Sequence, residues 1–368
     1  MKVAAARPCV LAPSGKYEIY GFFKYTAAAL GGSALGACGV MQMRSSQNRY
    51  YQGPVSDHFD GVRFFNPGGA EPKGLADLWK WRTGEKPTPW PESIPLAQVV
   101  KPAARVADLK VTMVGHATML VQTRGMNILT DPFWSDRASP VQFGGPKRVI
   151  EPGIAFQNLP PIDLILLSHC HYDHMDIDTL SRLKATHDPL VITPLGNDTI
   201  IAKTGLRCRV LDWGQSVRIG EMDIHCTPCH HWGARGVSDR SMALWAGFMM
   251  ETSQDRLLFI GDTGFDQGRP YHHLAKNFGK IRLAMLPIGA YDPRWFMADQ
   301  HQNPAEAVTG FQILDAQYAI GHHWGTIQLT NEGRNDPKLD LATALAAAQI
   351  DPTRFCAMEP ADTWSIPA

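Results

Sequence analysis

Three histidines and one aspartate lie within six residues near the middle of the chain. The segment follows an apolar run at 162–167 and reads Ser168-His169-Cys170-His171-Tyr172-Asp173-His174. Neutral imidazole and carboxylate are ligand types that Zn²⁺ accepts, so two histidines can face one ion while the following Asp and His face another. The spacing favours a metal-binding loop at the end of a buried strand. The alternative is a polar turn that is rich in histidine.

Other side chains of the same types follow apolar stretches later in the chain. His231, Asp262 and His323 each come directly after a predicted strand. Together with the histidine segment, they are spread over about 150 residues of the chain. Ligand sites in sheets flanked by helices gather where strands end. We therefore expect one open sheet edge to bring these residues together.

The elements that must position them are mainly short strands. We predict strands at 109–114, 118–123 and 126–130, where apolar and β-branched residues are separated by Gly-containing turns. A helix at 177–184 follows the histidine segment. The segment 199–203, between the predicted strands at 190–194 and 207–211, continues the alternation of strands and helices. The last predicted helix, at 304–314, begins behind Asn303 as its cap. The other predicted strands lie at 162–167, 190–194, 207–211, 222–227, 243–251, 256–260, 283–287 and 318–321.

Composition excludes some functions. The 35 basic and 35 acidic residues give no net charge, and no Lys/Arg-rich run is present, which disfavours nucleic acid as the main partner. Seven scattered cysteines do not indicate a disulfide framework. Cys226-Thr227-Pro228-Cys229-His230 matches the CxxCH pattern of c-type haem attachment, so a haem-binding protein remains an alternative.

The N-terminal part of the chain consists of a leader and an extension that precede the main domain. Residues 1–40 have the basic start, apolar middle and small-residue end of a secretory signal, and Leu35-Gly36-Ala37-Cys38 resembles a bacterial lipobox. This predicts a lipid anchor on Cys38 outside the cytoplasm, with a cytoplasmic or peripheral membrane protein as the alternative. Residues 41–105 are Pro-rich and aromatic, which predicts an extension that wraps a domain formed by 106–368. Its aromatic side chains are expected to be buried, namely Phe64, Phe65, Trp79, Trp81 and Trp90.

The motifs and their order along the chain resemble those of the metallo-β-lactamase superfamily, in which HxHxDH is followed by a His, an Asp and a final His. Within it the match is closer to the family of N-acylphosphatidylethanolamine-hydrolysing phospholipases D. The similarity runs from about residue 50 to the end, and its most specific part is the block PIGAYDPRWFM at 287–297. The resemblance implies an α/β fold, an αββα sandwich of two mixed sheets flanked by helices.

The resemblance also implies two zinc ions. His169, His171 and His231 would hold one ion. Asp173, His174 and His323 would hold the other, and Asp262 would bridge the two. The HW pattern of the family selects His231 over His230 and His323 over His322, which leaves those two neighbours as outer-shell or packing residues.

Three further residues are candidates for supporting roles. Asp131 either forms a turn or orients a ligand histidine, as metal-bound imidazoles require. His116 and His301 are candidate polar contacts or proton carriers near the metals, and His301 is the better of the two because it follows the specific aromatic block. For both, the alternative is a structural histidine.

The expected function is hydrolysis of a phospholipid phosphodiester by a hydroxide that bridges the two zinc ions, in the manner of a phospholipase D. N-acylphosphatidylethanolamine is one possible substrate, and a membrane surface is the expected partner. An apolar groove for acyl chains is predicted from Trp134, Phe143, Tyr291, Trp295 and Phe296. The alternatives are a lactonase or other ester hydrolase of the same superfamily, and a non-catalytic metal- or haem-binding lipoprotein.

Overall fold

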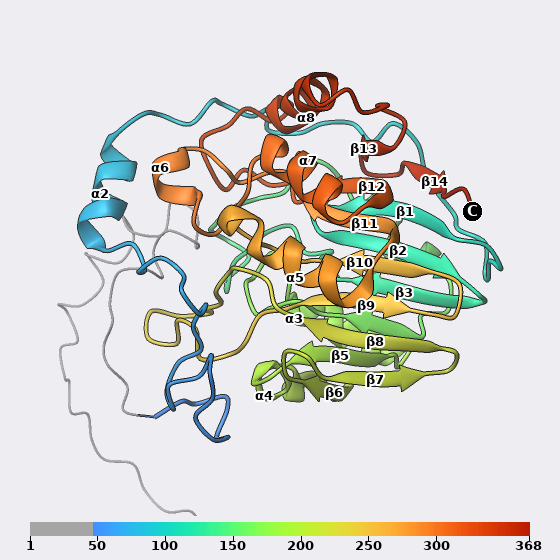
Figure 1. Ribbon diagram of the computed structural model, residues 1–368, viewed down its shortest axis with the longest axis horizontal. Coiled ribbons are helices and arrows are strands. Elements are labelled where there is room, and N and C mark those ends of the chain that lie inside the picture. The colour runs from blue at the N-terminus through green and yellow to red at the C-terminus, as the bar shows by residue number, and fades with distance from the viewer. Residues whose placement is uncertain (1–46) are drawn as a thin grey trace, which may run out of the picture.

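The computed structural model describes residues 47–368, which fold into an αββα sandwich of two seven-stranded sheets (Figure 1). The predicted leader and Cys38 lie outside the described residues. Within 47–368, no helix combines the length and the apolar character needed to cross a membrane.

The first sheet has the strand order β14-β1-β2-β3-β4-β5-β6. Its first three strand pairs are antiparallel and its last three are parallel. Parallel strands bring their carboxyl ends to the same edge, so the loops after β3 and β4 leave the sheet side by side. The strands are β1 (Lys110–Gly115), β2 (Thr118–Thr123), β3 (Met126–Thr130), β4 (Leu164–Leu166), β5 (Leu190–Pro194), β6 (Arg207–Leu211) and β14 (Thr363–Ser365).

The second sheet has the order β13-β12-β11-β10-β9-β8-β7 and repeats the same plan. Three antiparallel pairs from β7 to β10 are followed by three parallel pairs from β10 to β13. The exits of β10 and β12 therefore lie at one edge of this sheet. Its strands are β7 (Ser216–Ile219), β8 (Met222–Thr227), β9 (Gly247–Glu251), β10 (Arg256–Phe259), β11 (Ile281–Pro287), β12 (Ala316–His322) and β13 (Phe355–Ala357).

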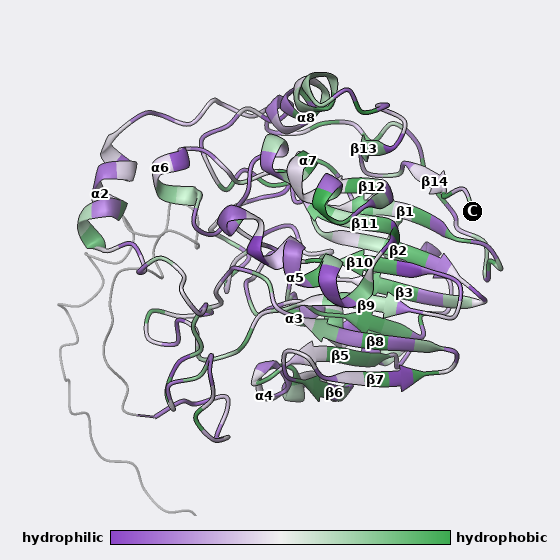
Figure 2. Ribbon diagram, viewed as in Figure 1, coloured by the Kyte–Doolittle hydropathy of each residue, from purple (hydrophilic) through white to green (hydrophobic). Residues whose placement is uncertain are grey.

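The core between the sheets is built by alternation along the strands. Leu257 and Phe259 of β10 point into the inter-sheet core, whereas Leu258 between them points to the other face of the sheet. Leu164 and Leu166 do the same from β4, with Ile165 directed outward. Both faces of these strands are buried, which explains why they are apolar almost throughout (Figure 2).

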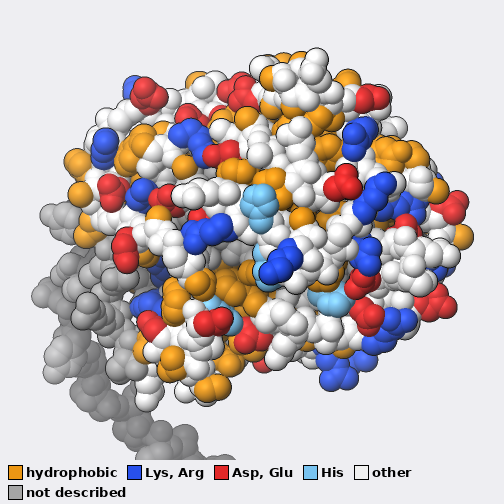
Figure 3. All heavy atoms as spheres, in the orientation of Figure 1, with side chains coloured by type: hydrophobic (Ala, Val, Ile, Leu, Met, Phe, Trp, Pro, Cys, Tyr) orange, Lys and Arg blue, Asp and Glu red, His pale blue; other side chains and the backbone are white. Residues whose placement is uncertain are grey.

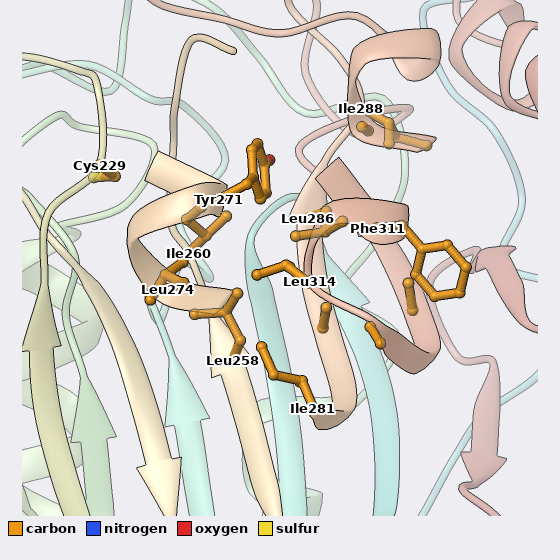
Figure 4. Close-up of a cluster of buried hydrophobic side chains, with 14 of the residues drawn as sticks. Cys229, Leu258, Ile260, Tyr271, Leu274, Ile281, Leu286, Ile288, Phe311 and Leu314 are labelled. Carbon is orange, nitrogen blue, oxygen red and sulfur yellow. The ribbon is translucent and has the colours of Figure 1, made fainter. Parts of the chain in front are cut away.

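Helices cover the outer face of each sheet. In the first sheet, Leu180 and Leu183 of α3 pack with the outward residues of β4 and β5. In the second, Tyr271, Leu274 and Phe311 pack over Leu258 and Leu286, as Figure 4 shows. The helices are α2 (Leu75–Thr83), α3 (Ile177–Thr186), α4 (Asn197–Ile201), α5 (Arg269–Phe278), α6 (Arg294–Met297), α7 (Pro304–Ile313) and α8 (Asp336–Ala347), with 3-10 turns η1 (Phe156–Asn158), η2 (Ala202–Thr204) and η3 (Asp266–Gly268).

The structure corrects several predicted elements. The predicted strand at 243–251 begins only at Gly247, because residues 243–246 form a buried stretch that precedes the strand. The strand before the histidine segment is also shorter than predicted, since β4 covers only Leu164–Leu166. The cap of α7 is confirmed, because the Asn303 side chain accepts from the N–H of Glu306. Helices α5, α6 and α8 and strands β7, β13 and β14 were not predicted.

Residues 47–105 lie against the sandwich through specific side-chain contacts. Trp81 of α2 donates its indole N–H to Asn331 Oδ1 at 3.0 Å, and Trp90 donates to the carbonyl of Glu332 at 2.9 Å. The prediction that all five aromatics are buried is wrong. Phe64 and Trp81 are buried, but Trp79 is 72% exposed because it lies two residues from Trp81 on another side of α2. Phe65 is also partly exposed.

Candidate metal centre

The predicted site residues come together where strands of both sheets end. The histidine segment and Asp131 follow β4 and β3 of the first sheet, whereas His231, Asp262 and His323 follow β8, β10 and β12 of the second. The expectation of a single sheet edge is therefore wrong. The site lies at matching ends of two packed sheets, and the inter-sheet core fixes the distance between its two halves.

One group of imidazoles consists of His169, His171 and His231. His169 Nε2 lies 2.9 Å from His171 Nδ1, and His231 Nε2 lies 3.4 Å from the same atom. All three residues are at most 3% exposed. The Nδ1 atom of His231 faces the carbonyl of Gln300 at 3.0 Å, which leaves Nε2 directed into the group. Three converging nitrogens of this kind can hold one metal ion.

A second group contains Asp173, His174 and His323, and the structure adds His116 to it. Asp173 Oδ2 lies 2.9 Å from His116 Nε2 and 3.4 Å from both His174 Nε2 and His323 Nε2. His116 was predicted only as a nearby polar contact. It reaches the group from the turn between β1 and β2.

Asp262 lies between the two groups. Its Oδ2 atom is 3.0 Å from His323 Nε2 and 3.3 Å from His174 Nε2, and it is 3.6 Å from His231 Nε2. The ring of His301 also approaches, with Nδ1 3.9 Å from the same oxygen. A carboxylate in this position can contact ions held by either group.

Asp131 is placed to orient the ligand candidates. Its Oδ2 atom accepts from His174 Nδ1 at 2.6 Å and from the Ser168 hydroxyl at 2.6 Å, while Ser168 Oγ lies 2.8 Å from His169 Nδ1. The carboxylate thus fixes one ring directly and another through a hydroxyl. This is the contact that metal-bound imidazoles require on their second nitrogen.

Three of these residues have backbone conformations that disfavour ordinary side chains. His116, Asp131 and His323 have φ angles of 57°, 32° and 63°. Hydrogen bonds to neighbouring residues maintain two of these conformations. The N–H of His323 donates to the carbonyl of His116 at 2.9 Å, and the N–H of Asp131 donates to that of Leu166 at 3.0 Å. Strained backbone that the surrounding structure enforces is characteristic of functional sites.

The pKa shifts separate the histidines of the first group from His323 of the second, but not from His116. Burial lowers the pKa of His169 and His171 well below its usual value and lowers that of His231 to about 4, so all three rings are neutral at neutral pH. Burial also opposes charge on His323, but the carboxylates of Asp262 and Asp173 outweigh it and raise its pKa to about 9. Burial and the neighbouring His323 lower the pKa of His116 to about 4. Positive charge in the second group is therefore favoured at His323, beside the two carboxylates, and a divalent cation would also supply it.

Buried polar atoms without a hydrogen-bond partner indicate that these residues are suited to bind metal ions. Among the described residues, His174 Nε2, His323 Nε2 and Asp262 Oδ1 are buried and make no hydrogen bond. Buried polar atoms are normally paired, because leaving one unpaired costs about 1–3 kcal/mol. Coordination of a cation would satisfy all three atoms, and the mixture of imidazole and carboxylate suits zinc.

The neighbours His230 and His322 do not face either group. His230 Nδ1 pairs with Asp266 Oδ2 at 2.8 Å, and His322 is buried against Phe259. The CxxCH cysteines also lie apart from each other. Cys226 is in the inter-sheet core and Cys229 is in the core on the outer face of the second sheet, so the two thiols cannot attach to one haem.

The predicted aromatic groove is largely wrong. Trp134 is buried and donates its indole N–H to the carbonyl of Ile154, Tyr291 is buried with its hydroxyl bonded to Asp340, and Phe143 is 82% exposed. Phe296 does line a narrow apolar cleft beside His301, together with Leu78, Trp81, Met297 and Leu329. Trp295 is half-exposed next to it, with the Lys80 ammonium 4.4 Å above its ring.

A side chain of the extension, Asn66, holds the loop that carries His231. Its Nδ2 atom donates to the carbonyl of His231 at 2.8 Å, and its Oδ1 atom accepts from the Trp245 indole at 3.0 Å. Because an indole can only donate, the orientation of the amide is fixed. No feature of the sequence around Asn66 indicated this role.

The substitution Asn66→Asp is expected to weaken metal binding about tenfold or more, because the retained oxygen still accepts from Trp245 while the other oxygen repels the His231 carbonyl. Chelator competition followed by metal counting measures this. Asn48→Asp is the matched control, since the Asn48 side-chain amide also donates to backbone carbonyls, but to those of Val62 and Met242 and not to that of His231. Equal metal loss in the two variants would assign Asn66 a general structural role.

Comparison with known proteins places this geometry among metal-dependent hydrolases. Residues 126–324 match the model of the beta-lactamase superfamily domain. The chain is 37% identical over 271 residues to N-acyl-phosphatidylethanolamine-hydrolyzing phospholipase D 1 of Caenorhabditis elegans, covering 70% of this chain and 76% of that protein. The mitochondrial N-acyl-phosphatidylethanolamine-hydrolyzing phospholipase D of Saccharomyces cerevisiae is 32% identical, over 62% of this chain and 50% of that protein.

Among solved structures, the isothiocyanate hydrolase from Delia radicum gut bacteria superposes with a TM-score of 0.57 at 18% identity. The match covers 70% of this chain and 99% of that one. At this level of identity the likeness concerns the fold alone, and it agrees with the two-sheet sandwich described above.

Proposed function

Because this chain belongs to the metallo-β-lactamase superfamily, we propose that it is a dinuclear zinc hydrolase that cleaves a phosphodiester bond of an N-acylated glycerophospholipid. The carrying observation is the pair of buried His/Asp groups on either side of Asp262. The names of the two phospholipase D relatives support the choice of substrate.

In this proposal, His169, His171 and His231 hold one ion and Asp173, His174 and His323 hold the second, with Asp262 between them. Bound zinc supplies Lewis-acid activation of water and neutralises the charge of the phosphodiester. The remaining work is done by the protein. Asp131 fixes the rings of His174 and His169, and the buried walls exclude bulk water from the reacting bond.

His301 and His116 take different supporting roles. His301 lines the apolar cleft and its ring centroid lies 5.0 Å from that of His231, so it can contact the substrate or carry a proton to the departing alcohol. His116 contacts Asp173 and His323, and it is not among the residues that line the apolar cleft. We assign it to holding Asp173 in place.

The direct test is metal counting on the purified protein beside a turnover assay. Zinc-loaded protein is expected to release phosphatidate from N-acylphosphatidylethanolamine, as measured by mass spectrometry, and to lose this activity after chelation. An acyl lactone and a simple carboxylic ester are assayed in parallel. Turnover of the lactone or ester without any release of phosphatidate would contradict the proposal and favour an ester hydrolase.

We also propose that the surface formed by α2 and α6 meets the lipid. Leu75, Trp79 and Trp295 are 58%, 72% and 41% exposed, and the Lys80 ammonium lies over the Trp295 ring. Other residues of the same two helices, Leu78 and Phe296, line the cleft beside His301. Exposed aromatics next to basic residues favour the interface of an anionic bilayer. On the face in Figure 3, acidic and basic side chains are interspersed.

Trp79→Ala is accordingly expected to lower the fraction of protein that sediments with vesicles containing phosphatidylserine by about threefold or more, because a large exposed aromatic group no longer enters the interface. Phe143→Ala is the control, since Phe143 is 82% exposed but lies outside α2 and α6, in the loop between β3 and η1. An unchanged bound fraction for Trp79→Ala, or an equal loss in both variants, would contradict the assignment of this surface.

A further inference from the structure

A polar cavity of about 330 Å³ lies between the extension and the metal centre, on the other side of Trp232 and Arg240 from the apolar cleft. Segment 64–72 forms one wall. The opposite wall includes His230, His231 and Gln300. Because His231 belongs to the first imidazole group, a molecule in this cavity would lie next to the metal centre. Its volume is at the lower end of the range for small-ligand sites.

His230 presents one ring nitrogen to this cavity. Its side chain is only 8% exposed, and Nδ1 is fixed by Asp266 Oδ2 at 2.8 Å. The other nitrogen, Nε2, points to Gly69, where an added Cβ would lie 2.9 Å from it. Among the described residues, no hydrogen bond to Nε2 is formed. Glycine at position 69 therefore lets the backbone of the extension approach an oriented nitrogen of a buried ring without a clash.

The chemistry of this atom follows from its partner. A carboxylate can only accept, so Nδ1 carries a hydrogen, which leaves Nε2 as the nitrogen of this tautomer that accepts. It would pair with a ligand that bears an N–H or O–H group. In a glycerophospholipid diester, the diacylglycerol half has ester oxygens but no such donor. The alcohol half can have one, such as the amide N–H of an N-acylated ethanolamine or a free hydroxyl.

We propose that the cavity is the subsite for the alcohol half of the substrate and that His230 selects alcohols that carry a hydrogen-bond donor. The diacylglycerol half then lies outside this cavity. This inference rests on the proposed function and deepens it. His230 is a specificity-determining residue that contacts the substrate away from the metal ions.

The test compares two lipids that differ in one hydrogen. N-acylphosphatidylethanolamine has an amide N–H, and its N-methyl analogue does not. The ratio of their kcat/KM values is expected to be about ten in the zinc-loaded wild-type protein, the value of one well-made hydrogen bond. In His230→Phe the ratio is expected to fall to about one, and His230→Gln, which restores an acceptor, is expected to recover part of it. A general loss of activity affects both lipids and cancels from the ratio.

A second variant tests the cavity without altering the histidine. Ala70 is exposed on the cavity wall, so Ala70→Trp fills the space from outside. It is expected to lower turnover of N-acylphosphatidylethanolamine at least about fivefold relative to phosphatidylmethanol, whose methyl group is too short to extend into the cavity. Ala97→Trp, on another exposed part of the extension, is expected to leave this ratio unchanged.

Failure of this inference is distinguishable from failure of the proposed function. If the wild-type protein cleaves the diester but His230→Phe keeps the tenfold ratio, the subsite assignment is wrong while the function stands. If no phosphodiester is cleaved, calorimetric binding of free N-acylethanolamine and its N-methyl analogue to zinc-loaded protein decides. Tighter binding of the N–H compound that disappears in His230→Phe supports the subsite, and equal binding of both compounds overturns it.

Discussion

Asp262→Asn is expected to lower kcat/KM by about 10³-fold or more and to reduce the bound metal. The substitution keeps the shape of the side chain but removes its charge and one acceptor oxygen. Asp262 Oδ2 lies within 3.6 Å of nitrogens from both groups, so its loss affects both ion positions at once. Losing several kcal/mol of electrostatic stabilisation corresponds to this change in rate.

The measurement combines metal counting with turnover of N-acylphosphatidylethanolamine at saturating zinc. Asp223→Asn is the control, because Asp223 is partly exposed on β8 and pairs only with Arg218 among the ion pairs of the described residues. Full activity and two retained ions in Asp262→Asn would remove Asp262 from the centre. A loss of activity with normal metal content would instead place its role in the chemical step.

Much of the sandwich could be predicted because its strands are buried on both faces. Strands β2, β3, β5, β6 and β8 have the predicted bounds, since each is an apolar or β-branched stretch that ends at a turn or a polar cluster. The edge strands β13 and β14 are only three residues long and partly exposed, which leaves no periodicity to detect. Helix α5 contacts the sheet through few side chains, chiefly Tyr271 and Leu274.

The candidate ligands could be identified in the sequence by residue type and by their position after strands. The residues that contact them could not be predicted in the same way. His116 joins Asp173 because the turn between β1 and β2 in one sheet meets the exit of β12 in the other, a contact between residues about 200 positions apart. Asn66 and His230 acquire their proposed roles through single side-chain contacts with distant segments. Such contacts depend on how the two sheets and the extension pack, which local patterns do not encode.

The backbone at the site depends on a glycine whose role is visible only in three dimensions. Gly289 follows β11 in the PIGAYDPRWFM block, and an added Cβ would lie 2.2 Å from the carbonyl oxygen of His323 and 3.1 Å from Trp324 Cβ. These are backbone and buried atoms that cannot rotate away. His323 itself is held at a φ of 63° by the contact of its N–H with His116.

Gly289→Ala is therefore expected to destabilise the protein by about 3 kcal/mol and to lower Tm by roughly 5 °C or more, because one methyl group must displace the loop after β12. The same displacement moves His323 out of the second group, so zinc content and activity should fall together with stability. Thermal unfolding and metal counting measure both effects. Gly144→Ala is the control, since an added Cβ there meets no atom within 4 Å. If Gly289→Ala unfolds at the wild-type temperature with two ions bound, the loop that carries His323 can adjust to the extra methyl group and the ligand geometry does not depend on this contact.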